Sequence, residues 1–450
     1  MNRLLKLWET VHSSFWFIPG VMSAVAAGLA FGTVALDRAK SDEWRENFGF
    51  LYTGGAEGAS TVLGTIAGSM ITIAGVVFSM TLIALSLASS QLGPRLLRNF
   101  MRDAINQVVL GTFVATFLYC LLVLRTIRRA EDNLFVPHLA VTLGVVLAVA
   151  SVGVLIYFIH HISLSIQADQ VVARVGRELM RGIDDIFPDR LDPAAQDRSE
   201  EPVGTGLPPG FDEEAREVLA SEGGYVRSVA IGALMQLATE EDVVFMVERG
   251  PREYVVEHRP LVRVWPAVRV TEHLVKRVNN AFSLGSSRTP GQDIEFSVDQ
   301  IVEIAVRALS PGVNDPFTAV RCVDQLASAL SLVAQREIPS PLHYDEHGQL
   351  RVVYSVVSFA DIADSAFNQI RQNARTNAAV TIRLLEAIKA VAAFADRLDD
   401  RAALRRHAEM IARGAREGLP EENDRREVNQ RYTAVIETLD GPGPGLGPRS

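Results

Sequence analysis

Polar side chains that could do chemistry gather in one segment of the C-terminal half. Asp361, Asp364, Asn368, Arg371 and Arg375 follow one another at intervals of three and four residues. This spacing places them on one face of a helix. Such a stripe is usually a solvated face with ion pairs, and the alternatives are a buried polar network or a contact between subunits.

A second polar segment spans residues 308–319 and contains Asn314 and Asp315 directly before Pro316. Asp followed by Pro is a helix-start signal, with Asp as the N-cap and Pro at the first helical position. The simplest interpretation is therefore a corner between two helices. If this corner meets the stripe at 361–375, the two segments form a candidate polar pocket.

Enzyme signatures are missing from the sequence. There is no Walker A loop, no H-E-x-x-H, no G-x-S-x-G and no C-x-x-C motif. His343 and His347 flank a predicted hairpin turn, but two histidines without a third ligand make a weak metal site. Cys120 and Cys322 lie in dissimilar surroundings, so free buried thiols are expected. We expect no catalytic residues, no cofactor and no metal.

Composition divides the chain of 450 residues into two zones. Hydrophobic residues make up 48% of the sequence and charged residues only 22%, and the mean hydropathy is +0.15. Residues 1–165 carry a net charge of +2 and the remainder carries −11, in agreement with −9 for the whole chain. Nucleic-acid binding needs clustered Lys and Arg, so the acidic C-terminal zone excludes a nucleic-acid partner.

The N-terminal zone contains long stretches without charged residues. A membrane span needs about 20 apolar residues, and four stretches reach that length. The first of these stretches is too long for a signal peptide and is followed by further spans. The predicted spans are residues 14–36, 61–90, 105–124 and 134–160. The lipid bilayer is therefore the first expected partner.

Small residues recur along the second span at intervals of 4, 7, 4, 7 and 4, which places them on one stripe of a helix. The members are Gly64, Gly68, Gly75, Ser79, Ser86 and Ser90. One interpretation is close helix packing, within a subunit or between subunits. The other is a pore lined by symmetry-related copies. Because the stripe contains no acid or base, active ion transport is disfavoured.

A basic group follows the second span. Arg95, Arg98 and Arg102 share one helix face, which predicts a short interfacial helix with its basic side toward lipid headgroups. The positive-inside rule then places the N-terminus, this loop and the C-terminal zone in the cytoplasm. Three arginines within 125–129 would lie on the opposite side and argue against this orientation.

The expected fold is mainly α: a four-helix transmembrane region followed by a helix-rich soluble domain with a small β-sandwich or barrel. Apolar periodicity, Pro and Gly clusters and alternating runs set the boundaries. The expected parts are a transmembrane domain at 1–165, a helical stalk at 166–187, a linker at 188–211, a β-rich domain at 212–268, a helical domain at 269–438 and a disordered tail at 439–450.

Four long motifs, occurring in order along the chain, carry a family resemblance. Residues 68–79, 91–100, 158–162 and 308–319 resemble a large bacterial family of predicted integral membrane proteins of unknown function. The resemblance implies a bacterial inner-membrane protein with a four-helix membrane part and a soluble C-terminal part, and it brings no catalytic residues. Residues 222–268 are also faintly similar to lipoyl-like domains, but the lysine for lipoylation is absent.

Two hypotheses of function follow. The leading one is a homo-oligomer that forms a passive pore or channel, with the second span as the lining helix. The alternative is a membrane-anchored sensor or scaffold whose soluble part binds a partner through the corner at 314–315 and the stripe at 361–375. A membrane enzyme ranks third.

Overall fold

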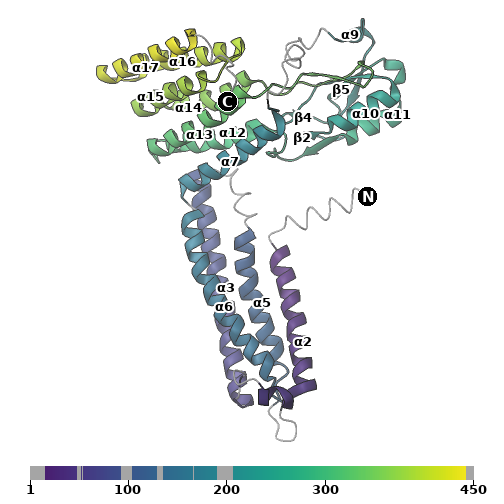
Figure 1. The fold of residues 1–450 in the computed structure, drawn as a ribbon, viewed down its shortest axis with the longest axis vertical. Coiled ribbons are helices and arrows are strands. Elements are labelled where there is room, and N and C mark those ends of the chain that lie inside the picture. The colour runs from purple at the N-terminus through teal and green to yellow at the C-terminus, as the bar shows by residue number, and fades with distance from the viewer. Residues whose placement is uncertain are drawn as a thin grey trace, which may run out of the picture. The chain divides into compact units, whose positions relative to one another are not determined.

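A computed structural model describes residues 16–47, 52, 54–92, 104–128, 135–165, 167–189 and 206–441. The chain divides into two compact units, Met1–Gln170 and Val171–Ser450, which we term the membrane unit and the C-terminal unit. Figure 1 shows long helices side by side in the first, and helices with two small sheets in the second.

The membrane unit consists of four long helices. These are α2 (Phe17–Asn47), α3 (Ala56–Leu92), α5 (Ala104–Leu124) and α6 (His138–Ser165). Each contains a stretch that is long and apolar enough to cross a membrane. These stretches coincide with the four predicted spans, and the second one extends over 32 residues, more than a straight crossing needs.

Helix α5 is the centre of this unit, since it packs against α2, α3 and α6. Buried hydroxyls and a carboxylate connect the helices at one end. The Tyr119 hydroxyl donates to the Ala140 carbonyl at 2.9 Å and lies 3.1 Å from the Thr33 hydroxyl. The carboxylate of Asp37 accepts from the backbone N–H groups of Leu139 and Ala140 and thereby caps the start of α6.

The C-terminal unit contains two sheets. Its strands are β1 (Arg216–Leu219), β2 (Gly224–Val229), β3 (Val244–Val247), β4 (Tyr254–Val255), β5 (Pro260–Trp265), β6 (Phe282–Gly285), β7 (Leu342–Tyr344) and β8 (Leu350–Val353). One sheet has the order β1-β5-β3-β8-β7 and the other β4-β2-β6. All pairs are antiparallel except β3 with β8.

The two sheets share one apolar core with α10 (Ile231–Glu241) and α11 (Glu272–Asn280), in which Phe245, Leu261 and Leu274 are fully buried. The short helices α9 (Phe211–Glu214) and η3 (Ala267–Arg269) complete this part. Within residues 206–441, neither sheet closes into a barrel. The larger sheet takes β7 and β8 from far beyond residues 212–268, and a long crossover connection allows β8 to pair in parallel with β3.

Helices form the rest of the C-terminal unit. They are α7 (Ala168–Ile186), α12 (Ile294–Ala308), α13 (Pro316–Gln335), α14 (Phe359–Asn373), α15 (Ala378–Ala392), α16 (Leu398–Gly418) and α17 (Glu422–Asp440). The mainly α fold class with small sheets is confirmed. Helix α13 is a fifth helix apolar enough to cross a membrane, yet it packs against α12, α14 and α15 and is part of this core.

Helix α7 covers the residues predicted as a stalk. Its buried face includes Val172, Leu179 and Ile183, and Gly176 lies against the Gln325 side chain of α13. A β-carbon at Gly176 would lie 2.2 Å from the Gln325 Oε1 atom, so a glycine permits this close approach. The helix is therefore packed into the C-terminal unit. Most of the predicted linker and tail, residues 190–205 and 442–450, lies outside the described residues.

Candidate functional site

Helix α3 has a buried face that holds the membrane unit together. From Ser60 onward its buried residues follow one another at intervals of three and four, as in a helix-packing seam. They are Ser60, Leu63, Ala67, Met70, Ala74, Val77, Thr81 and Ala84. Helix α3 packs against α5 and α6, and we name this row the inner seam.

The predicted small-residue stripe lies on a different face of α3. Gly68, Gly75, Ser79 and Ser86 are exposed and Gly64 is half-buried. A β-carbon built at any of the three glycines would have no atom of the chain within 4 Å, apart from its own helix backbone and chain neighbours. The glycines of the stripe are therefore not packed against another helix in the part of the chain that the structure describes. The side chains of Ser90, Arg95, Arg98 and Arg102 lie outside the described residues.

Three exposed threonines widen this face. Together with the exposed stripe residues they form a row at intervals of three and four residues, with a last interval of seven, which we name the outer seam: Thr61, Thr65, Gly68, Thr72, Gly75, Ser79 and Ser86. Each threonine hydroxyl donates to the carbonyl four residues earlier, at 2.8 to 2.9 Å. The outer seam follows the inner seam by one or two residues, or roughly 100° to 200° of rotation, so the two face different sides.

The stripe on α14 has a different environment. Asp361 and Ser358 form a capping box at the start of α14. Asp364 Oδ1 lies 2.6 Å from Arg406 Nη2 and 2.8 Å from His407 Nε2, both on α16. Of the remaining members, Asn368 accepts a hydrogen bond from Arg371 of the same helix at 3.3 Å. Arg375 pairs with Glu417 of α16 at 2.5 Å.

The corner before α13 is a local structure. Asp315 caps α13 by accepting from the Thr318 N–H at 3.1 Å and its hydroxyl at 2.6 Å. Asn314 has a left-handed backbone with φ +50°, and Phe317 is 79% exposed. No hydrogen bond or ion pair joins Asn314 or Asp315 to the stripe within the described residues. The ion pairs of the stripe instead lead to α16.

His407 is a buried titratable group that the sequence did not indicate. Burial lowers its pKa to about 4, and the positive charges of Arg406 and Arg371 act in the same direction. The Asp364 carboxylate has the opposite, weaker effect of raising this pKa. The ring also packs edge-on against Phe367, with 5.4 Å between ring centroids. Burial, together with Arg413 and Arg375, lowers the pKa of Arg371. One histidine within a charged helix carries no pattern from which this position could be inferred.

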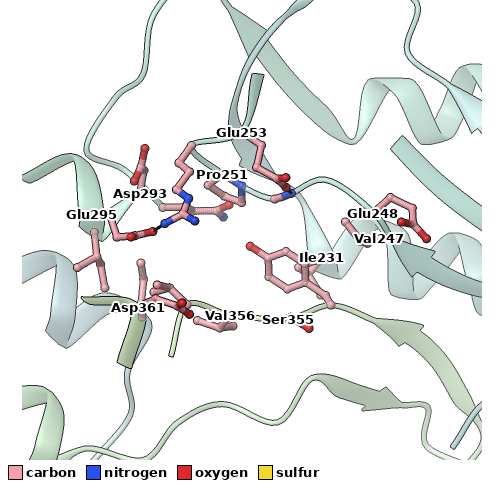
Figure 2. A pocket seen from close by; sticks show the side chains of 17 residues that line it. Ile231, Val247, Glu248, Pro251, Glu253, Asp293, Glu295, Ser355, Val356 and Asp361 are labelled. Carbon is pink, nitrogen blue, oxygen red and sulfur yellow. Dashed lines mark hydrogen bonds and ion pairs between the residues drawn. The ribbon is translucent and has the colours of Figure 1, made fainter. Parts of the chain in front are cut away.

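A pocket of about 460 Å³ lies within the C-terminal unit, where the turn between β3 and β4, the start of α12 and the loop before α14 come together. Figure 2 shows Asp293 and Glu295 toward one end, with Ile231 and Val247 toward the other. Sequence analysis missed this pocket, because its lining comes from five separate segments of the chain. Among the described residues, no three acidic, histidine or cysteine side chains are grouped to hold a metal.

Comparison with known proteins agrees with this architecture. The model of a family described as predicted membrane proteins, DUF2254, matches residues 12–390. The uncharacterized protein Rv1290c of Mycobacterium tuberculosis and the uncharacterized protein Mb1321c of Mycobacterium bovis are each 32% identical to this chain over 460 residues. Each match covers 100% of this chain and 85% of the relative.

No solved structure gives a significant match. The family resemblance inferred from residues 68–79, 91–100, 158–162 and 308–319 is confirmed by these matches. The chain belongs to the DUF2254 family of predicted membrane proteins.

Proposed function

We propose that this membrane protein is a homo-oligomer that forms a passive pore, with the outer seam of α3 at the contact between copies and along the pore. One observation carries the proposal: the outer seam is exposed and uncharged, and its glycines have no neighbour outside their own helix among the described residues. Helices in lipid associate through small residues because backbones can then approach closely. A second copy of the chain is the occupant that suits this face.

Passive conduction fits the chemistry of α3 better than pumping or catalysis does. From Gly58 to Leu92 the helix contains no charged residue, and ion-coupled transport depends on ionisable groups inside the membrane. The threonine hydroxyls on the outer seam already donate to their own backbone, so their oxygens remain as weak acceptors for water. A row of this kind lines a water path without trapping ions.

Reconstitution tests the proposal. The wild-type protein in planar bilayers should conduct, and it should migrate as an oligomer in mild detergent by light scattering. Gly75→Leu, on the outer seam, should reduce both the oligomer and the conductance, because the added side chain separates the helices. Val76→Leu, exposed on α3 beside the seam, should leave both unchanged. A monomeric wild type, or conductance unaffected by Gly75→Leu, would reject the pore.

Membrane sidedness is part of the same proposal. We place both termini in the cytoplasm of a bacterial cell, with the chain in the inner membrane, on the support of Arg95, Arg98 and Arg102 and the positive-inside rule. A green fluorescent protein fused after Ser450 should then fluoresce, and an alkaline phosphatase fused there should be inactive. The opposite pair of results would reverse the orientation.

A membrane-anchored sensor is the second candidate function. The observation that favours it is the pocket of about 460 Å³ in the C-terminal unit. Small-molecule sites commonly have volumes of about 300–1,000 Å³. In this version the C-terminal unit binds a ligand, and the membrane unit anchors it or responds to it. Ligand-dependent change in conductance, or in a captured partner, tests that coupling.

A further inference from the structure

Polar and apolar side chains together line the pocket in the C-terminal unit. Figure 2 shows Glu295 and Asp293 toward one end, and Ile231 and Val247 toward the other, where Glu248 also lies. Val356 and Tyr354 also line the cavity. A ligand that fills such a space has a polar or charged head and an apolar body.

Among the described residues, Arg252 is the only cationic side chain in the lining of this pocket, and an unusual turn places it there. The turn runs from Gly250 to Glu253, with the Glu253 N–H donating to the Gly250 carbonyl and Pro251 at its second position. Arg252 occupies the third position with φ +82°, where glycine is the ordinary residue. A side chain kept in a strained backbone conformation is typical of a functional position.

A buried carboxylate orients the guanidinium. Glu295 is 4% exposed and forms an ion pair with Arg252 Nη1. The Ser365 hydroxyl of α14 donates to the other oxygen of Glu295 at 2.6 Å. This support leaves most of the guanidinium available. Arginine carries five N–H donors, one is used here, and the Arg252 side chain remains 46% exposed.

The other carboxylates of the lining already have partners. Asp293 forms a two-pronged ion pair with Arg288 at 2.7 and 2.9 Å, and it also caps α12. The three others are satisfied in the same way: Glu253 by Arg249 and the Gly250 N–H, Glu248 by Arg263, and Asp361 by Ser358. Of the charged side chains that line the pocket, Arg252 is therefore the one with N–H donors left to bind a ligand.

We propose that this pocket binds a small organic carboxylate with an apolar body. The ligand carboxylate pairs with the free N–H groups of Arg252, while Glu295 holds the opposite edge of the guanidinium. The apolar body lies against Ile231, Val247 and Val356. This inference rests on the sensor function proposed above for its biological role, whereas binding itself is measurable without any conductance or partner.

Calorimetry on the full-length protein in lipid nanodiscs tests the ligand class. Three probes share one six-carbon chain and differ in the head group: hexanoate, hexanol and hexylamine. Hexanoate should bind at one site per chain, and hexanol and hexylamine should bind at least ten-fold more weakly. Preferential binding of hexylamine would assign the pocket to cations through its carboxylates and overturn the proposal. Equal binding of hexanoate and hexanol would also overturn it.

Two substitutions at Arg252 locate the site. Arg252→Gln should weaken hexanoate binding at least ten-fold, because the charge-assisted pair is lost. Arg252→Lys keeps the charge but cannot present a fork to Glu295 and the ligand together, so it should also weaken binding while preserving the fold. The control is Arg259→Gln, at an exposed position outside the lining, which should bind as the wild type does.

The outcomes separate the two proposals. Hexanoate binding that survives both Arg252 variants would reject this pocket. Binding that depends on Arg252, but changes neither conductance nor partner capture, would confirm the site and reject the sensor function. No binding of hexanoate by the wild type rejects the ligand class directly, whatever the conductance shows.

Discussion

Two helices of this protein carry polar or small residues mostly at intervals of three and four, but the two rows have different neighbours. On α3, no other element of the described part of the chain lies against the glycines of the outer seam. In the C-terminal unit, Asp364 on α14 and Arg375 in the turn after it form ion pairs with Arg406 and Glu417 of α16. The same spacing thus marks an open face in the membrane unit and a covered face in the C-terminal unit.

This difference shows which structural information the spacing of residues provides. Spacing determines which residues share a face, but the neighbour of that face is determined by the rest of the fold. Helix α3 carries two such rows, and the mostly apolar inner seam was the less conspicuous in the sequence. An apolar row in a membrane helix suits lipid as well as protein, so the sequence alone does not say which row is buried.

The strongest test of the covered face on α14 is its aromatic anchor. Phe367 is fully buried and contacts the His407 ring of α16. Phe367→Ala should lower the free energy of unfolding of the C-terminal unit by about 3–5 kcal/mol, because it leaves a cavity. Urea unfolding of the full-length protein, followed by circular dichroism, measures this. Phe317→Ala, at an exposed position, is the matched control and should change stability by less than about 0.5 kcal/mol.

Titration tests the same interface. Burial lowers the pKa of His407 to about 4 from its ordinary 6.5, so the unfolded chain binds a proton more readily than the folded protein does. Stability should therefore be constant above about pH 6.5 and fall as the pH is lowered toward 4, by up to about 3 kcal/mol. His407→Leu should remove this part of the pH dependence in urea unfolding at several pH values. An unchanged slope would show that His407 is accessible to solvent.

Adjacent residues on α3 sharpen the comparison within one helix. Ala74 lies on the buried inner seam and Gly75 on the exposed outer seam. Ala74→Leu should destabilise the membrane unit by about 1–3 kcal/mol through overpacking. Gly75→Leu should leave monomer stability unchanged or slightly higher, since leucine is the better helix former. Detergent-denaturant unfolding of the monomer measures both, and similar losses in the two variants would contradict the two-seam description.

Much of the architecture was predictable because it depends on local composition. Four charge-free stretches predict the membrane helices, and these coincide with α2, α3, α5 and α6. Asp315 before Pro316 predicts the start of α13, and the structure has it there with Asp315 as the cap. In each case the cause lies within a few residues of the element it determines.

Other features depend on contacts between distant segments and left no local signal. The larger sheet joins β3 with β8, more than a hundred residues later in the chain. The candidate pocket of Asn314 and Asp315 with the α14 stripe was expected from two polar segments, but the stripe pairs with α16. Arg252 and Glu295, which lie 43 residues apart, meet only in the folded chain.

The smallest expected effect concerns the outermost ion pair of the covered face. Arg375 and Glu417 have side chains 47% and 61% exposed, so water screens their attraction. Glu417→Gln should lower the free energy of unfolding by less than about 1 kcal/mol, and by still less in 0.5 M salt. Urea unfolding at low and high salt, with Glu437→Gln on α17 as the control, measures the difference. A larger loss of stability that does not depend on salt would show that another chain covers this end of the stripe. The stripe would then, like the outer seam of α3, be a contact between chains.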